Sequence, residues 1–170
     1  MLSCEAALLS EALLFAVCFM IYLGADHGGF QKKEEIKLLL KEMGVAFEDL
    51  GNTAYDPNDD YPVFAQKVAE AVSENPKKHK GILLCRSGVG VDIVANKFPD
   101  VRSALIASRE LAQLSRMHDD SNVLALASDY LTESETRQIV KVWLNTPFTG
   151  EERHVRRLAK IAEIEKSLKS

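Results

Sequence analysis

Short apolar runs alternate with stretches of helical periodicity along most of this chain. Runs of four to six residues, typical of buried strands, occupy 21–24, 45–50, 81–85, 103–107 and 122–127. Apolar positions at helical spacing fill the segments between and after them: 31–43, 61–73, 91–97, 110–117, 132–145 and a charged helix from about 150 to the end. Strands separated by helices indicate repeated βαβ units with right-handed crossovers. The pattern therefore predicts an α/β fold, a doubly wound three-layer α/β/α sandwich around a five-stranded parallel sheet.

The first nineteen residues stand apart from this alternation. They are apolar, but Glu5 and Glu11 interrupt them and no Lys or Arg precedes the apolar stretch, so they resemble neither a signal peptide nor a membrane span. Two interpretations stay open: an amphipathic helix that packs on the domain or on a partner, and an upstream extension of the coding frame. A membrane anchor is the third alternative. We divide the chain into an N-terminal extension, 1–19, and one domain, 20–170, that includes the C-terminal helix.

Composition and charge exclude several classes of protein. The chain has 170 residues, of which 46% are hydrophobic and 27% charged, as in an ordinary globular domain rather than a disordered or fibrous one. The net charge of −4 gives no basic excess for binding nucleic acid. The three cysteines are an odd number without metal-like spacing, so we expect no disulfide framework, no zinc site and a reducing compartment, the cytoplasm.

Polar residues gather where the predicted strands meet their connections. In an open α/β sheet, ligands bind beyond the carboxyl ends of the strands. The segments 24–29 and 85–90 follow the first and third predicted strands, and 118–122 lies between the fourth and fifth. We therefore expect all three segments to lie at one rim of the sheet.

The segment from Cys85 to Gly90 is the strongest local signal. A strand ends at Cys85, small residues follow, and a helix is predicted to begin near Val91. Unpaired amides at the start of a helix bind anions, and their field favours the thiolate form of a nearby cysteine. A thiolate beside such a turn suits proton abstraction next to a carbonyl, or nucleophilic attack. The alternative is a buried cysteine that acts only as a small apolar side chain.

Three further groups each have a chemical and a structural interpretation. Asp26 and His27 could bind a phosphate or move protons, or one of them could be the N-cap of the following helix. His118 could be a catalyst or a hydrogen-bonded loop residue. Arg153 and Arg157 lie four residues apart on one face of the last helix, where they could bind one phosphate or belong to a solvated charged face.

Taken together, five blocks in a fixed order are more specific than any single motif. The blocks are GADHGGF, DYPVFA, GILLCRSGVGVDIVANKFP, RMHDDSNVLALAS and VWLNTPFTGEERHVRR. Their order and spacing resemble the ribose-5-phosphate isomerase B family, which includes allose-6-phosphate isomerase and the subunits of galactose-6-phosphate isomerase. The resemblance runs from about Met20 to Ile164.

The resemblance implies a fold and an activity. The fold is a Rossmann-like α/β/α sandwich, in agreement with the predicted sheet. The reaction interconverts an aldose phosphate and a ketose phosphate through an enediolate, without a metal or a cofactor, in carbohydrate metabolism and the pentose phosphate pathway. The active sites lie between the subunits of a homodimer or a tetramer, and the C-terminal arm contributes to the neighbouring site.

The resemblance also implies roles for individual residues. Cys85 matches the general base, and His118 matches the residue that helps to open the sugar ring. Ser87 matches a hydroxyl residue that stabilises the enediolate oxygen, together with the amides of Gly88, Val89 and Gly90. The remaining matches are substrate contacts: Asp26, His27, Tyr61 near the sugar, and the phosphate ligands Arg153 and Arg157.

Three positions depart from the family pattern. Arg86 stands where Gly is common after the base, Asp119 stands where Asn follows the ring-opening His, and Asp129 replaces a phosphate-binding Arg. We keep Arg86 and Asp119 among the expected substrate-binding residues. The two added acids should weaken the binding of an anion, since like charges at short range repel. Arg86 could offset this effect, or pair with Asp129.

The sequence thus predicts an isomerase of a sugar phosphate, most simply ribose 5-phosphate, with no nucleic-acid or membrane partner. An isomerase of allose or galactose 6-phosphate is one alternative. A sugar-phosphate binding or regulatory module that has lost turnover is another, motivated by Asp119 and Asp129. A flavodoxin-like or receiver domain shares the sheet class but requires a phosphate loop or a paired acidic pocket that the sequence lacks.

Overall fold

The computed structural model describes residues 20–168, which form alternating strands and helices around one sheet. The strands are β1 (Met20–Ala25), β2 (Phe47–Asp49), β3 (His79–Cys85), β4 (Ser103–Ile106) and β5 (Val123–Ala127). The helices are α2 (Phe30–Glu42), α3 (Tyr61–Glu74), α4 (Val89–Ala95), α5 (Arg109–Asp119), α6 (Glu133–Asn145) and α7 (Glu152–Leu168). The proposed extension, 1–19, lies outside the described residues.

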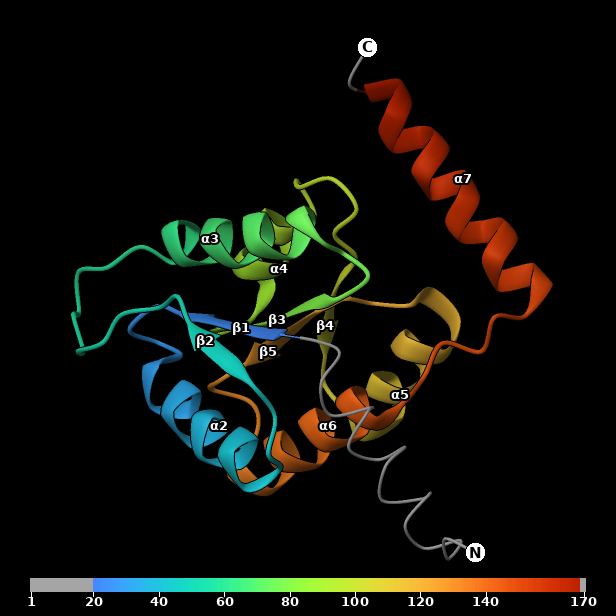
Figure 1. The fold of residues 1–170 in the computed structure, drawn as a ribbon. Helices are drawn as coiled ribbons and strands as arrows, with labels where there is room; N and C mark the ends of the chain where they lie inside the picture. Colours follow the sequence, from blue (N-terminus) through green and yellow to red (C-terminus); the bar gives the residue numbers. More distant parts are fainter. Residues whose placement is uncertain (1–19, 169–170) are drawn as a thin grey trace, which may run out of the picture.

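The sheet is parallel throughout, with the strand order β2-β1-β3-β5-β4. Helices α3 and α4 cover one face, and α2, α5 and α6 cover the other (Figure 1). The predicted three-layer α/β/α sandwich with a five-stranded parallel sheet is therefore confirmed.

Two apolar layers hold the sheet between the helices. Because side chains alternate along a strand, Ile82 and Leu84 of β3 pack toward one layer, while Leu83 and Cys85 pack toward the other. Trp143 of α6 is fully buried in the first layer. Both faces of the central strands β3 and β5 are buried under helices, which explains their nearly continuous apolar sequences.

Three element boundaries differ from the predictions for local reasons. The predicted strand at 45–50 is only three residues long, because Gly44 (φ 66°) ends α2 and the N–H of Val45 still bonds Leu40 of that helix. Helix α4 begins at Val89, earlier than predicted, after a left-handed residue at its N-cap. Helix α5 extends to Asp119 and ends at Asp120, whose φ is 45°.

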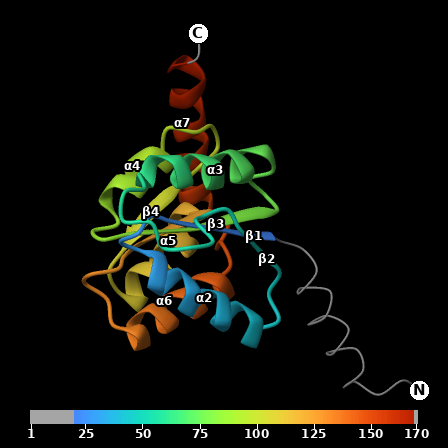
Figure 2. The same cartoon turned by 90° about the vertical axis from the view of Figure 1, so that its left-hand side faces the viewer.

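Helix α7 extends away from the rest of the domain (Figures 1 and 2). His154 is its buried residue, whereas Ile161, Ile164 and Leu168, which share one side of the helix, are exposed. No helix within 20–168 is long and apolar enough to cross a membrane.

Candidate active site

The ends of β1, β3 and β5 meet at one edge of the sheet. Ala25 is in register with Leu84, and Cys85 with Ala127. The chain beyond β5 also bonds the chain beyond β3, because the N–H of Ser128 donates to the carbonyl of Cys85. The loops that begin at Asp26 and at Cys85 are therefore neighbours at the carboxyl edge, as predicted.

The thiol of Cys85 is nearly buried and faces a backbone amide. Its side chain belongs to the apolar layer under α3 and α4, yet the N–H of Gly88 donates to Sγ at 3.1 Å. A donor directed at the sulfur stabilises negative charge there. The interpretation of Cys85 as only a small apolar residue does not account for this contact.

Gly88 can make this contact because it has no side chain. Its φ is 73°, and a Cβ would lie 2.4 Å from Cδ1 of Leu105 and 3.0 Å from the backbone of Leu126. The same N–H that was expected to face an enediolate oxygen is instead directed at the sulfur of Cys85.

In the rest of the turn, Ser87 is accessible to solvent and Gly90 packs against the first residue of α3. Ser87 is exposed, and its hydroxyl accepts from the N–H of Val89 at 3.4 Å. The ring of Tyr61 lies against Gly90, where a Cβ would come within 2.6 Å of the ring. The start of α3 therefore brings Tyr61 beside this loop.

Asp26 closes the turn that leads into α2. Its side chain is buried, and Oδ1 accepts from the N–H of Gly29 at 3.1 Å. Burial raises the pKa of Asp26, while the hydrogen bond from Gly29 acts in the opposite direction. The N-cap of α2 is Gly29 itself, so the prediction that Asp26 or His27 is the N-cap is wrong.

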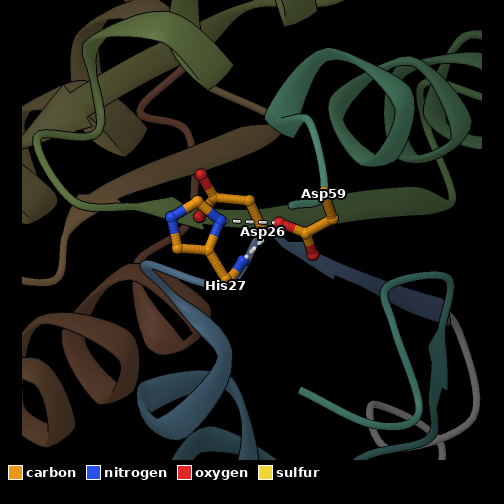
Figure 3. Close-up of side chains that lie close together, drawn as sticks. All are labelled: Asp26, His27 and Asp59. Carbon is orange, nitrogen blue, oxygen red and sulfur yellow. Dashed lines mark hydrogen bonds and ion pairs between the residues drawn. The ribbon is translucent and has the colours of Figure 1, made fainter. Parts of the chain in front are cut away.

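His27 is bound by an acid that the sequence analysis missed. Asp59 Oδ1 accepts from the backbone N–H of His27 at 2.8 Å and lies 2.8 Å from Nδ1 of its ring (Figure 3). This hydrogen bond raises the pKa of His27. Asp59 lies in an acid-rich loop beyond β2, the neighbour of β1, and that position was the available signal.

Asp26, His27 and Asp59 also form a group that could hold a metal ion. Their ligand atoms all lie within 4.8 Å of one another. Hydrogen bonds account for this arrangement, since both carboxylates accept N–H groups of the loop. Clusters of acidic groups of this kind are common without an ion.

Two of the residues that depart from the family pattern, Arg86 and Asp129, lie side by side at this edge. Nη1 of Arg86 is 3.6 Å from Oδ2 of Asp129, and the two side chains are 64% and 47% exposed. The stem of Arg86 covers Gly28, where a Cβ would come within 2.5 Å of Cγ. The expectation that Arg86 pairs with Asp129 is confirmed.

The segment 118–122 lies at the opposite edge of the sheet. The N–H of Asn122 donates to the carbonyl of Arg102, and Arg102 directly precedes β4. The Arg102 guanidinium also bonds the carbonyls of Asp119 and Asp120. These contacts place the end of α5 at the amino ends of the strands, so the prediction of one common rim is wrong. A helix that joins two parallel strands returns the chain to the amino edge.

At this amino edge, His118 lies against a second histidine. The ring of His154, which is 1% exposed, lies against the ring of His118, with centroids 4.4 Å apart and ring planes inclined at 51°. The hydroxyl of Thr149 lies 3.1 Å from Nδ1 of His154 and donates to the carbonyl of Met117. The first turn of α7 is thereby attached to the last turn of α5.

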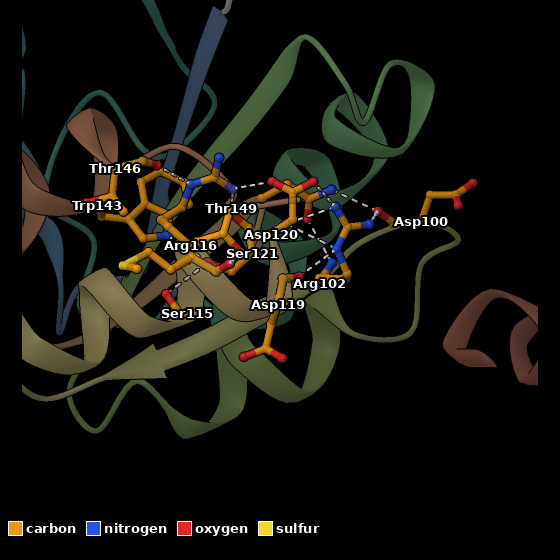
Figure 4. Close-up of polar contacts among 12 residues, drawn as sticks. Asp100, Arg102, Ser115, Arg116, Asp119, Asp120, Ser121, Trp143, Thr146 and Thr149 are labelled. Atoms are coloured by element: carbon orange, nitrogen blue, oxygen red, sulfur yellow. Dashed lines mark hydrogen bonds and ion pairs between the residues drawn. The ribbon is translucent and has the colours of Figure 1, made fainter. Parts of the chain in front are cut away.

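A buried polar network supports the turn that follows His118. Arg116 donates to the carboxylate of Asp120 at 2.7 Å and to the carbonyl of Ser121 at 2.6 Å (Figure 4). The indole N–H of Trp143 donates to the hydroxyl of Ser121, which donates to Ser115. This network was not predicted, because the bond from Trp143 to Ser121 joins residues 22 positions apart and depends on how α6 packs against the turn.

The expected phosphate ligands are exposed near the start of α7. Arg153 and Arg157 are both solvent-accessible, and Arg153 bonds Glu151 at 2.9 Å. Asp119 is also exposed. The expected residues thus form two groups, one around Cys85 at the carboxyl edge and one around His118 at the amino edge.

Comparison with known proteins decides the family. A family profile described as ribose/galactose isomerase matches residues 21–161. The chain belongs to the ribose/galactose isomerase family. It is 45% identical over 148 residues to a probable ribose-5-phosphate isomerase B of Mycoplasma genitalium, a match that covers 87% of this chain and 97% of that protein. The ribose-5-phosphate isomerase B of Escherichia coli is 41% identical over 145 residues, 85% of this chain and 95% of the relative.

Solved structures agree with this membership. The crystal structure of ribose-5-phosphate isomerase B from Mycoplasma genitalium with bound ribulose-5-phosphate superposes with a TM-score of 0.84 at 44% identity, covering 87% of this chain and 97% of that one. As a member of the ribose/galactose isomerase family, the chain is a sugar-phosphate isomerase. The interpretation as a flavodoxin-like or receiver domain is therefore wrong.

Proposed function

We propose that this isomerase interconverts ribose 5-phosphate and ribulose 5-phosphate, with Cys85 as the base. The observation that carries the proposal is the thiol of Cys85 at the end of β3, with the amide of Gly88 directed at its sulfur. The names of the relatives and the ribulose-5-phosphate bound to the Mycoplasma genitalium protein support the choice of sugar.

The reaction consists of proton transfers. The Cys85 thiolate removes the proton from C2 of the open-chain aldose, and the electron pair of that bond forms the C1–C2 double bond while O1 becomes negative. The resulting thiol returns the proton to C1, and the hydroxyl proton moves from O2 to O1, which leaves the ketone at C2. These steps transfer no electrons to or from another molecule, so they need no redox cofactor.

Negative charge on the enediolate oxygen needs donors at the turn after β3. The N–H groups of Val89 and Gly90 lie in the first turn of α4 and have no intrahelical acceptor. The exposed hydroxyl of Ser87 lies beside them. With the Gly88 amide directed at the base, we assign the oxygen to Ser87, Val89 and Gly90.

Ring opening and phosphate binding require a second chain. His118, Arg153 and Arg157 are at the amino edge, whereas Cys85 is at the carboxyl edge. A complete site forms when His118 of the partner subunit and its arginines meet the Cys85 loop, and we therefore propose a homodimer, alone or within a tetramer. The exposed apolar side of α7 supports this assembly, as do exposed apolar side chains on α4, β4 and α5: Val89, Ile93, Leu105, Leu111 and Leu114.

Other features of the chain fit this activity. A thiol base is preserved in a reducing compartment, so we place the enzyme in the cytoplasm. The proposed interconversion of ribose and ribulose 5-phosphates assigns it to the pentose phosphate pathway. Asp119 and Arg86 remain proposed substrate neighbours, and the pairing of Arg86 with Asp129 limits the repulsion of an anion by that carboxylate.

An isomerase assay across three substrates tests the proposal. The parent enzyme should turn over ribose 5-phosphate in preference to allose and galactose 6-phosphates, and Cys85→Ser should abolish most of that activity. If the enzyme turned over only a six-carbon sugar phosphate, that sugar phosphate would replace ribose 5-phosphate as the assigned substrate. Binding of the sugar phosphates without turnover would instead identify a binding module.

A further inference from the structure

The loop between β2 and α3 reaches the end of β1 through one carboxylate. The side chain of Asp59 is only 6% exposed, although most of this loop is exposed. Its Oδ1 is occupied by the backbone N–H and the ring of His27, and its Oδ2 accepts from Nδ2 of Asn52 at 2.6 Å. Because both oxygens have partners, the carboxylate is fixed against the His27 ring (Figure 3).

The two ring nitrogens of His27 have different environments. An ionised carboxylate has only lone pairs, so the contact with Asp59 requires a proton on Nδ1. Nε2 makes no hydrogen bond with any residue of 20–168, and the side chain is 24% exposed. A second proton at Nε2 would make the ring a cation whose free N–H can donate to an anion.

The charged groups around the ring favour that cation. The hydrogen bond to Asp59 is the main cause that raises the pKa of His27, and the charges of Asp26 and Asp59 act in the same direction. Partial burial and the charge of Arg86 oppose them. Tyr55, whose ring meets the His27 ring edge-on at 6.4 Å, is the other titratable neighbour.

A buried lysine anchors the loop that carries Asp59. Lys33 of α2 is fully buried, and its Nζ bonds the Asp49 carboxylate at 2.7 and 2.9 Å and the carbonyl of Asn52 at 2.6 Å. A buried ammonium group is stable only with such partners. Asn52 in turn bonds Asp59, so hydrogen bonds run without interruption from α2 to the His27 ring.

We propose that Asp59, held by Asn52 and Lys33, is a positioning residue that keeps His27 as an imidazolium directed at the phosphate of the substrate. The identity of the anion rests on the proposed function. The His27 imidazolium would supply a positive charge to a site where Asp129 stands in place of the arginine expected from the family pattern.

The charge of the His27 ring can be followed directly by NMR. The chain has only four histidines, so labelling histidine with ¹³C gives few ring signals, and the His27 signal is the one missing in His27→Gln. Asp59→Asn keeps the shape of the side chain and removes its charge. Asp56→Asn is the matched control, because Asp56 lies in the same loop, is exposed, and its carboxylate accepts only from the N–H of Asn58 among residues 20–168.

We expect the pKa of His27 to lie above the ordinary value of 6.5 in the parent and in Asp56→Asn, and to fall in Asp59→Asn. At a pH between the two midpoints that the titrations give, where the parent ring is charged and the Asp59→Asn ring is neutral, inorganic phosphate should bind Asp59→Asn about tenfold more weakly. The KM for ribose 5-phosphate should rise about tenfold at that pH, the scale of one charged hydrogen bond. The kcat should change by less than about twofold, because the phosphate is remote from the bonds that react. Asn52→Ala should lower the pKa of His27 in the same direction by a smaller amount, since it loosens the carboxylate without removing its charge.

Equal His27 titrations in Asp59→Asn and Asp56→Asn would overturn the proposal, as would unchanged phosphate binding at the pH between their midpoints. Failure of the proposed function has a different signature. In that case the parent does not turn over ribose 5-phosphate, while the titration and the binding of inorganic phosphate still decide what Asp59 does.

Discussion

Gly88 stands at the turn between β3 and α4, and adding one methyl group there tests how tightly the Cys85 loop is built. A residue with a Cβ at φ 73° is strained by ~1–2 kcal/mol. The Cβ would also lie 2.4 Å from Cδ1 of Leu105 and 3.0 Å from the backbone of Leu126, and such crowding of a packed region costs ~1–3 kcal/mol. Gly88→Ala should therefore lower the free energy of unfolding by about 2–5 kcal/mol.

Gly44→Ala provides the control for this prediction. Gly44 has a similar φ, 66°, but no atom lies within 4 Å of the position of its Cβ. Gly44→Ala should lower the free energy of unfolding by the backbone strain alone, ~1–2 kcal/mol. The difference between the two variants in urea denaturation is therefore the cost of the contacts made by the Cβ at position 88. The end of the Leu105 side chain can rotate away, but the backbone of Leu126 cannot, so the turn at Gly88 must shift. We therefore expect kcat to fall in Gly88→Ala and not in Gly44→Ala. Equal destabilisation of the two variants would show that the turn is not tightly packed.

Three further predictions concern single side chains. Cys85→Ala should lower kcat by at least about 100-fold in the isomerase assay, the scale of general base catalysis, and leave phosphate affinity nearly unchanged; near-normal turnover would remove Cys85 as the base. Asp129→Arg should tighten the binding of ribose 5-phosphate by roughly 1–3 kcal/mol, and Arg86→Ala should weaken it less in that background than in the parent, as a double-mutant cycle would measure; additive effects would separate the two residues. Burial and the nearby Arg116 lower the pKa of Lys80 to about 8 from 10.5, so this group makes the protein more stable as the pH rises from about 8 toward 10.5. Lys80→Met should abolish that rise in denaturation experiments at pH 7 and pH 10, and an undiminished rise would contradict the assignment.

The fold was predictable because its signals are local. Apolar runs such as 81–85 and the helical spacing between them define βαβ units, and the topology follows from the handedness of the crossovers. Boundaries depended on single backbone conformations, such as the left-handed residues Gly44 and Asp120, which end α2 and α5. These conformations shifted the ends of elements without changing their order.

The site was predictable in its residue types but only partly in its geometry. Cys85, Asp26 and Tyr61 come together because they follow or adjoin neighbouring strand ends. His118 was expected at the same rim, but a connecting helix returns the chain to the other edge of the sheet. Asp59 was missed because its role depends on contacts with His27 and with Asn52, whose carbonyl bonds a buried lysine, and sequence distance does not reveal such contacts.

The central claim is that each site takes its base from one chain and its ring-opening histidine from another. Cys85→Ala and His118→Ala should each be nearly inactive alone. When equal amounts are unfolded together, refolded and assayed on ribose 5-phosphate, random pairing makes half of the dimers hybrids, each with one intact site of two, so about a quarter of the parent activity should return. No recovery, with hybrid dimers verified by mass spectrometry, would contradict a site shared between chains.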